Sequence, residues 1–224
     1  MKRYAVVGAS SGTGREIVRV LASRGSQVRA ISRRPLPAQP NVEPYAADVT
    51  DVVSLTRALD EPFDAVFYTV DIHGMRQPRE AIRAVMYTGC LNAMQAALAG
   101  GTKRFVLLSV IGADQSSWVW WLLNSMKRGM QRNILDREKA LEADGIPYVI
   151  LRAPRLNDGM GNPGSLSATP VQHRLDMKMG IARSDLALAL ISAADAAPAN
   201  SRWDVFSETR GTAPMWLKPD GKGG

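Results

Sequence analysis

The sequence predicts an α/β fold in which a doubly wound parallel sheet carries helices on both faces. Three observations predict it. Short apolar runs typical of buried strands alternate with stretches of helical periodicity. The first of these runs leads through a glycine-rich turn into a helix. The 224 residues, 46% of them apolar, suffice for one full core, so we expect a single domain over residues 1–210 and a flexible tail over 211–224.

The glycine-rich turn spans residues 8–14, between a strand at 4–7 and a helix at 15–22. Such a turn directs free backbone N–H groups and the positive end of the helix dipole at one point. Because glycine has no Cβ, a pyrophosphate can approach the backbone closely. We therefore expect the turn to bind a dinucleotide. The residues expected to do so are Gly8, Ser10, Ser11, Gly12, Thr13 and Gly14.

The second strand, over residues 27–31, ends at Ser32, Arg33 and Arg34. A site that prefers NAD places an acidic residue about 20 residues beyond the glycines, where it binds the ribose 2′-hydroxyl. Ser32 stands there instead, and two arginines follow. Guanidinium groups form charge-assisted, often bidentate bonds with phosphate. We therefore interpret Arg33 and Arg34 as binding the 2′-phosphate of NADP. The simpler interpretation is that they are two solvated cations at a strand end.

The third strand is expected near residues 45–47, beyond a proline-punctuated loop. Asp48 and Val49 follow it and are expected to contact the cofactor. Thr50 or Asp51 is expected to cap the next helix. Asp48 could accept a hydrogen bond from the adenine amino group or could itself cap that helix. The sequence leaves both roles open.

The alternation continues through the middle of the chain. The expected elements are strand four at 64–68, a long helix at 79–98 and strand five at 104–108. Thr69 and Val70 follow strand four, while Leu108 and Ser109 end strand five. Because the carboxyl ends of parallel strands meet at one edge of a sheet, we expect these residues to line the cofactor site.

Residues 117–143 contain no proline and predict one long amphipathic helix. The apolar residues at every fourth position are Trp118, Leu122, Met126, Met130 and Ile134. Such a stripe is usually core, and it can also wall a substrate pocket or form a subunit contact.

Strand six is expected at 148–151 and leads to Pro154 and Arg155, which complete the predicted cofactor edge. Residues 157–170 are rich in Gly, Pro, Ser and Asn and predict a mobile loop or lid over the site. The last expected elements are a helix from Ser184 or Asp185 to about Ala196 and a strand at 203–206.

Composition narrows the possible partners. The formal net charge is +7, but the basic residues are scattered, so no nucleic-acid partner is expected. The apolar run 118–123 is too short to span a bilayer, which takes roughly 20 residues, and no membrane partner is expected. The single cysteine, Cys90, and the lack of a signal-peptide pattern favour the cytoplasm. His73 and His173 are isolated, so no metal site is expected.

Several segments together resemble the atypical short-chain dehydrogenases/reductases, over nearly the whole chain. The segments are 8–14, 47–49, 103–109, 138–154 and 182–187. The resemblance implies a Rossmann-like domain that binds NAD(P).

The usual catalytic pair of that family is a Tyr and a Lys four residues later, on the helix after strand five, with a Ser at the strand's end. Two alignments of this helix place the pair at Leu135 and Lys139, or at Met130 and Ile134, so both lack the tyrosine. The chain is therefore most similar to the branch of NmrA-like proteins and flavin/biliverdin reductases. Ser109 is the one catalytic residue that the resemblance implies, as a donor to a substrate oxygen. Lys139 is expected to be a solvated helix residue.

The sequence as a whole predicts an NADPH-dependent reductase of a small, flat, apolar acceptor. Such an enzyme would work mainly by orienting the nicotinamide against the acceptor. The alternative is a protein that binds NADP(H) as a regulator or sensor without turnover, and a non-redox enzyme that retains the dinucleotide comes third. A monomer and a homodimer are both compatible with the sequence.

Overall fold

An eight-stranded sheet forms the centre of the molecule. The computed structural model describes residues 1–72, 77–207 and 213–218, so His73 lies outside the described residues. The strand order is β3-β2-β1-β4-β5-β6-β10-β8. Neighbouring strands are parallel except β8, which runs antiparallel to β10. The chain builds outward from β1 to β3, returns to β4 beside β1 and builds outward again, which confirms the doubly wound α/β fold.

The strands of the large sheet are β1 (Arg3–Val7), β2 (Gln27–Ser32), β3 (Val42–Ala46), β4 (Ala65–Tyr68), β5 (Phe105–Val110), β6 (Tyr148–Ala153), β8 (Ser167–Thr169) and β10 (Ser201–Phe206). A separate two-stranded sheet pairs β7 (Arg155–Asn157) with β9 (Gly180–Ala182). The helices are α1 (Gly12–Ser23), α2 (Val52–Ala58), α3 (Arg79–Arg83), α4 (Gly89–Ala99), α5 (Trp118–Met126), α6 (Met130–Ala143) and α7 (Arg183–Ala196). No helix of the described residues is both long and apolar enough to cross a membrane.

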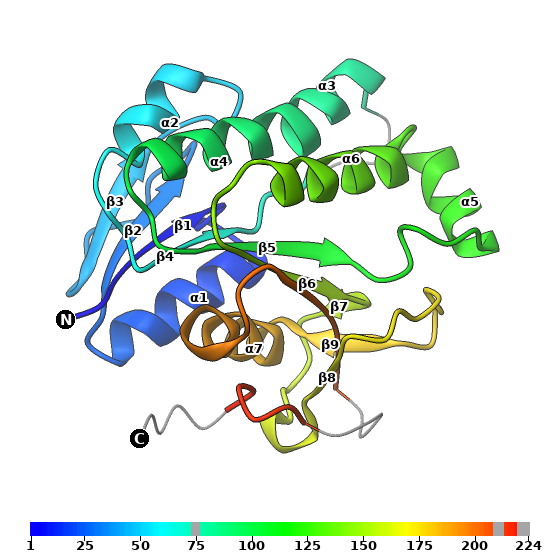
Figure 1. Cartoon of the computed structure of the whole chain (residues 1–224). Helices are drawn as coiled ribbons and strands as arrows, with labels where there is room; N and C mark the ends of the chain where they lie inside the picture. Colours follow the sequence, from blue (N-terminus) through cyan, green and yellow to red (C-terminus); the bar gives the residue numbers. More distant parts are fainter. Residues whose placement is uncertain (73–76, 208–212, 219–224) are drawn as a thin grey trace.

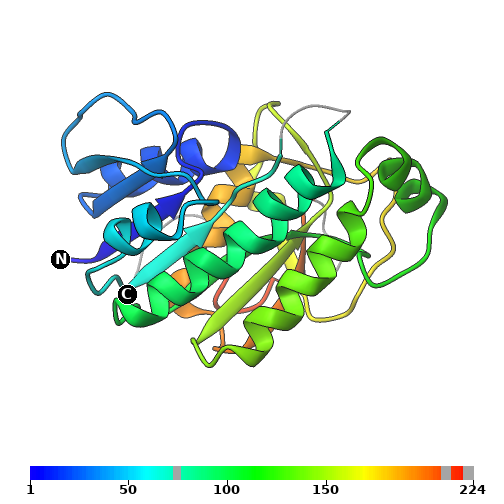
Figure 2. The same ribbon diagram turned by 90° about the horizontal axis from the view of Figure 1, so that it is seen from above.

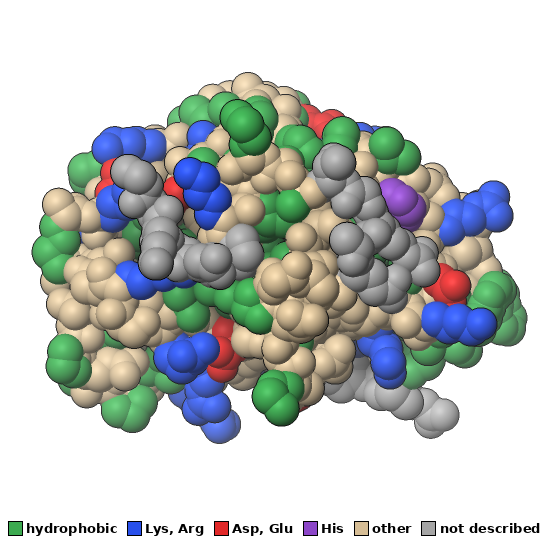
Figure 3. All heavy atoms as spheres, turned by 90° about the horizontal axis from the view of Figure 1, so that it is seen from below, with side chains coloured by type: hydrophobic (Ala, Val, Ile, Leu, Met, Phe, Trp, Pro, Cys, Tyr) green, Lys and Arg blue, Asp and Glu red, His purple; other side chains and the backbone are tan. Residues whose placement is uncertain are grey.

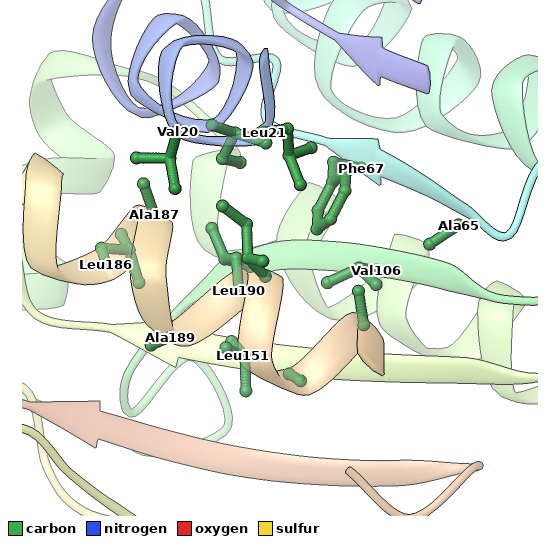
Figure 4. Packing of buried hydrophobic residues seen from close by; sticks show 14 of the residues in the cluster. Val20, Leu21, Ala65, Phe67, Val106, Leu151, Leu186, Ala187, Ala189 and Leu190 are labelled. Atoms are coloured by element: carbon green, nitrogen blue, oxygen red, sulfur yellow. The ribbon is translucent and has the colours of Figure 1, made fainter. Parts of the chain in front are cut away.

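The sheet has a hydrophobic core on each face, because successive strand residues point to opposite sides. Val6 belongs to the cluster under α1 and α7, whereas Val7 belongs to the cluster under α2, α4 and α6. Figure 1 shows these two sets of helices on opposite faces, and Figure 2 shows α4 and α6 side by side across one of them. In Figure 4, Leu21 of α1 and Leu190 of α7 meet near Phe67 of the sheet.

The helix expected at 79–98 is confirmed as one helical run, but it contains a π-helical turn, η1 (Ala84–Thr88), between α3 and α4. This turn holds one extra residue relative to α-helix and so alters which carbonyl groups are paired. The buried hydroxyl of Tyr68, at the end of β4, donates to the carbonyl oxygen of Val85 in this turn at 3.2 Å. The extra residue thus provides an acceptor for a hydroxyl in the core.

The single helix predicted over 117–143 is wrong: α5 ends at Met126 and α6 begins at Met130. Gly129 lies between them with φ +83°, a left-handed conformation that interrupts a right-handed helix. The predicted apolar stripe does not form one buried face, because Met130 and Ile134 are buried whereas Trp118 and Leu122 are exposed. The inner faces of both helices enter one cluster through Val119, Trp120, Met130 and Ile134.

Three smaller expectations need correction. The third strand begins at Val42 and includes Pro44, because β3 lies at the sheet's edge, where a missing N–H is tolerated. The loop predicted at 157–170 contains β8, which extends the sheet. Residues 213–218, in the expected flexible tail, bury Trp216 and Leu217 in the core under α1 and α7.

Candidate functional site

The glycine turn is a close-packed backbone loop between β1 and α1. The N–H groups of Gly8 and Ala9 both donate to the carbonyl oxygen of Ile31, which fixes the start of the turn on β2. Gly8 has φ +95° and Gly12 φ +55°. A Cβ on Gly14 would lie 2.3 Å from the carbonyl oxygen of Gly8, so only glycine allows this contact between helix and turn.

The first turn of α1 is built to attract an anion. The N-cap residue Ser11 makes no side-chain capping hydrogen bond, and the first turn contains no acidic residue. The leading N–H groups of a helix lack intrahelical partners and carry partial positive charge. Ser10, Ser11 and Gly12 are exposed, whereas the hydroxyl of Thr13 is buried without a partner among the described residues.

Arg183, the first residue of α7, lies beside this turn. A Cβ on Gly12 would be 3.3 Å from Arg183 Nε, so the guanidinium group borders the space that the glycine leaves open. Arg183 Nη1 also donates to Asp158 at 2.6 Å. Sequence reasoning missed the place of Arg183 beside the turn because it lies some 170 residues beyond it. Two features of the sequence could have indicated Arg183: it stands at the expected start of a helix, and it belongs to segment 182–187, which resembles the short-chain dehydrogenases/reductases.

The end of β4 lies against the glycine turn. Thr69 donates to the carbonyl oxygen of Val7 through both its N–H and its hydroxyl, at 3.0 and 3.1 Å. A Cβ on Gly8 would meet the Thr69 hydroxyl at 2.8 Å and a methyl group of Val70 at 3.2 Å. The structure therefore brings Thr69 and Val70 together with the turn, as their places at strand ends led us to expect.

Arg33 and Arg34 are exposed immediately after β2. Within the described chain, no hydrogen bond or ion pair of either guanidinium group is found. Both are therefore available to an anion at this edge. Arg33 is close enough to Asp48 for its charge to act on that carboxylate. The hydrogen bond from the Thr50 N–H, supported by the Thr50 hydroxyl and Arg33, lowers the pKa of Asp48.

Asp51, and not Asp48, caps α2, because its carboxylate accepts from the N–H groups of Val53 and Ser54. The capping role that the sequence left open for Asp48 is thereby filled. Asp48 Oδ1 instead accepts from the backbone and side chain of Thr50.

Val49, next in the chain, is held through its carbonyl oxygen by the buried amide of Asn92, at 2.9 Å. Asn92 lies on α4, which follows β4 in the sequence. This hydrogen bond therefore holds the loop after β3 against that helix.

Ser109 lies inside β5, and its hydroxyl donates to Glu138 of α6. Both residues are buried. A buried carboxylate is a strong acceptor and occupies this hydroxyl in the structure, so Ser109 positions Glu138 here. The expected role of Ser109 as a donor to a substrate stays a prediction.

Glu138 forms the centre of a buried ionic network that sequence reasoning missed. Arg152, opposite Ser109 on β6, donates to Glu138 at 2.6 Å and 3.2 Å and to Asp114 at 3.0 Å. Burial by itself would lower the pKa of Arg152, but Glu138 and Asp114 raise it above its usual value. The available signal was an arginine within the apolar run of strand six.

The remaining predicted residues occupy different environments. Met130 and Ile134, one of the two placements for the usual catalytic pair, are buried in an apolar cluster. Lys139 is exposed, as expected. Leu108 is partly buried, and its carbonyl oxygen accepts from Arg137 at 3.0 Å. Pro154 and Arg155 follow β6, the first buried and the second exposed.

No group of three or more His, Cys, Asp or Glu residues that could hold a metal ion is found in the described ranges. The residues at the carboxyl edge fit a dinucleotide better. The turn has an open glycine cradle and an uncapped helix N-terminus, and three arginines border the same edge. This donor set suits the phosphate groups of a dinucleotide.

Comparison with known proteins agrees with this geometry. A family model for NAD(P)H-binding proteins matches residues 8–197. The chain is 32% identical over 116 residues to a 3β-hydroxysteroid dehydrogenase/Δ5→4-isomerase of Mycobacterium tuberculosis, a match that covers 48% of this chain and 31% of that protein. The chain thus spans less than a third of that relative's length.

Two solved structures share the fold. The oxidoreductase YlbE from Lactococcus lactis superposes with a TM-score of 0.77 at 18% identity, over 91% of this chain and 90% of that chain. ChuY, an anaerobillin reductase from Escherichia coli O157:H7, gives a TM-score of 0.71 at 17% identity, over 95% and 100%. The family model, which matches most of the sequence, confirms the NAD(P)-binding resemblance: this chain belongs to the NAD(P)H-binding protein family.

Proposed function

We propose that the protein is an NADPH-dependent reductase of the atypical short-chain dehydrogenase/reductase type. The single observation that carries the cofactor assignment is the pair of exposed arginines, Arg33 and Arg34, at the end of β2, where an NAD site would hold a carboxylate. The reductase activity is supported by the family and by the likeness to YlbE and ChuY.

Different residues of the chain would bind different parts of the dinucleotide. The N–H groups of the glycine turn and Arg183 would hold the pyrophosphate, and Arg33 and Arg34 the 2′-phosphate. The loop after β3, which Asn92 fixes through Val49, would contact the adenine. Thr69 and Val70 would border the path toward β5. The bound nicotinamide supplies the hydride.

We propose that the acceptor is small, flat and apolar. The support is the apolar character of Met130 and Ile134, one of the two placements of the usual catalytic pair, because neither side chain can donate a proton. A positioned acid contributes about 10²- to 10⁴-fold in catalysis. Acceptors that take a hydride without strong acid assistance, such as quinones, flavins and conjugated enones, therefore suit this site better than simple ketones. Solvent or the acceptor itself would supply the proton.

A second candidate function is an NADP(H)-binding regulator or sensor without turnover. The observation that favours it is the bond from Ser109 to Glu138, which occupies the one hydroxyl expected to serve catalysis. Under either function we propose a monomer or homodimer that works in the cytoplasm on a small molecule.

Replacing Arg33 and Arg34 together by alanine is expected to weaken NADPH binding at least about tenfold and to leave NADH binding unchanged. The reason is the loss of charge-assisted bonds, each worth roughly 1.5–3 kcal/mol, to the 2′-phosphate. Titration calorimetry with both dinucleotides measures the effect. Arg57→Ala, at an exposed arginine of α2, is the matched control and should change neither affinity. Equal affinity of the double variant and the parent for NADPH would contradict the assignment.

Ser109→Ala is expected to lower turnover by less than about 10²-fold, because it removes one hydrogen bond and not a proton donor. Lys139→Ala should change turnover less still. NADPH oxidation, followed by the absorbance of the reduced nicotinamide, measures both against quinones, flavins, enones and plain ketones. Fast ketone reduction that collapses in Lys139→Ala would show a proton relay and contradict the proposed mechanism. No turnover with any acceptor would favour the sensor.

A further inference from the structure

The outer face of α5 is apolar and uncovered. Trp118 is 67% exposed, Trp121 74% and Leu122 37%, and their spacing places them on one side of the helix. The opposite side is anchored, since Val119 and Trp120 are buried and the Ser117 hydroxyl accepts from the Trp120 N–H. The indole groups are therefore held out to solvent by a well-packed helix. Two exposed tryptophans one helical turn apart indicate an interaction surface.

A basic hollow lies beside this face. Its volume is about 580 Å³, and Asn124, one turn after Trp121, lines it. The hollow opens between the start of α3, the end of α5 and the outer side of α6. Its lining residues are Arg79, Asn124, Arg128, Gly129, Gln131, Arg132, Leu135, Asp136 and Lys139. None of the residues predicted to bind the dinucleotide is among them.

The charge of the hollow is strongly unbalanced. Four cations line it, and the one carboxylate, Asp136, already pairs with Arg83 at 3.1 Å and lies 3.9 Å from Arg132. For Arg79, Arg128 and Lys139, no ion pair is found within the ranges 1–72, 77–207 and 213–218. These cations therefore keep their charge available for an external anion.

We propose that α5 and the basic hollow form a docking surface for an anionic membrane. The tryptophans and Leu122 would enter the boundary between headgroups and acyl chains, which tryptophan favours, and the hollow would receive phosphate headgroups. Figure 1 shows α5 at the extreme end of the molecule, and Figure 3 shows hydrophobic side chains exposed at that end. The protein binds on the surface and does not span it. This revises the expectation of no membrane partner, which rested on the shortness of the apolar run.

Charge complementarity decides between possible occupants. In a two-fold dimer through this surface, the same patch would face itself, and the arginines of both copies would meet. An acidic protein would satisfy the cations. The exposed indole rings of Trp118 and Trp121 suit the lipid boundary, and the polyglutamate experiment below distinguishes the acidic protein from the membrane.

The test is co-sedimentation of the full chain with vesicles of phosphatidylcholine alone or mixed with phosphatidylglycerol. We expect binding to the anionic vesicles only, with a blue shift of tryptophan fluorescence and loss of binding at high salt. Trp118→Ser combined with Trp121→Ser, and separately Arg128→Glu combined with Arg132→Glu, should each weaken binding at least about tenfold.

Matched controls come from α2. Val52→Ser with Val53→Ser removes two exposed apolar side chains, and Arg57→Glu reverses one exposed charge, so neither should affect vesicle binding. NADPH affinity should be unchanged in every variant, which verifies folding and keeps this test separate from the proposed function. Equal binding to neutral vesicles, or no effect of either double variant, would overturn the proposal.

Two further outcomes would reassign the surface. If light scattering shows that the parent protein is a dimer and that the double tryptophan variant is a monomer, the surface would be assigned to a second copy of the chain. Binding of polyglutamate without binding of vesicles would assign it to an acidic protein.

Discussion

Gly12→Val is expected to abolish NADPH binding and to leave the sheet folded. Gly12 has φ +55°, which a β-branched residue adopts only at high cost, and its Cβ would approach Arg183 Nε at 3.3 Å. The side chain would fill the space that a pyrophosphate needs and displace a cation that would bind it. We expect affinity to fall more than about 100-fold, or about 2.8 kcal/mol. Titration calorimetry measures the affinity, and circular dichroism verifies the fold.

Gly145→Val is the matched control, because Gly145 also has a positive φ, +82°, and nothing lies within 4 Å of its Cβ. It precedes β6 at the opposite edge of the sheet, so it should cost stability and spare binding. Normal NADPH binding by Gly12→Val would place the phosphate site elsewhere. Gly14→Val is a less clean test, since its Cβ would collide with backbone at the carbonyl of Gly8 and strain the fold itself.

The second large effect is expected at Glu138. Glu138→Ala should lower the free energy of unfolding by about 3–5 kcal/mol, because it removes the buried ion-pair partner of Arg152 and leaves it paired with the more exposed Asp114. For a chain of this size that corresponds to a fall in Tm of roughly 6–20 °C. Urea denaturation and calorimetry measure the two quantities.

Two further variants make this prediction specific. Glu142→Ala removes a half-exposed carboxylate that pairs with Arg202 at 3.4 Å, and should cost less than about 1 kcal/mol. Glu138→Leu combined with Arg152→Met removes both charges and should be less destabilising than Glu138→Ala, since neither member of the pair stays buried without the other. A loss below about 1 kcal/mol in Glu138→Ala would show that the network does not stabilise the fold.

Local patterns predicted the elements whose signals lie within a few residues. The glycine turn, the alternation of strands and helices and a cap at Thr50 or Asp51 needed only neighbouring residues. Regular spacing misled at residues 117–143, because residues at every fourth position suggested one continuous buried face. The backbone turns at Gly129, and α5 buries Val119 and Trp120 while Trp118 and Leu122 of the predicted stripe are exposed. The short strand β8 has no apolar run of its own and forms because β10 offers an unpaired edge.

The residues of the candidate site also fall into two groups, those that local patterns could place and those that they could not. Gly8, Thr69 and Val70 could be placed from their positions at strand ends. Arg183 and the partnership of Ser109 with Glu138 could not, because both depend on contacts between segments far apart in the sequence. Whether a buried hydroxyl faces a substrate or a carboxylate is decided by side-chain packing, which no spacing rule contains.

The π turn between α3 and α4 also bears on how this chain tolerates changes in length. A helix that gains one residue rotates everything beyond it by about 100°, which would turn the buried face of α4 toward solvent. The turn at Ala84–Thr88 absorbs that residue locally, so Cys90, Ala93 and Ala97 still face the sheet. A related chain one residue shorter here could close the turn into ordinary α-helix and keep both ends in phase. It would then have to find another acceptor for Tyr68, or replace that tyrosine by phenylalanine.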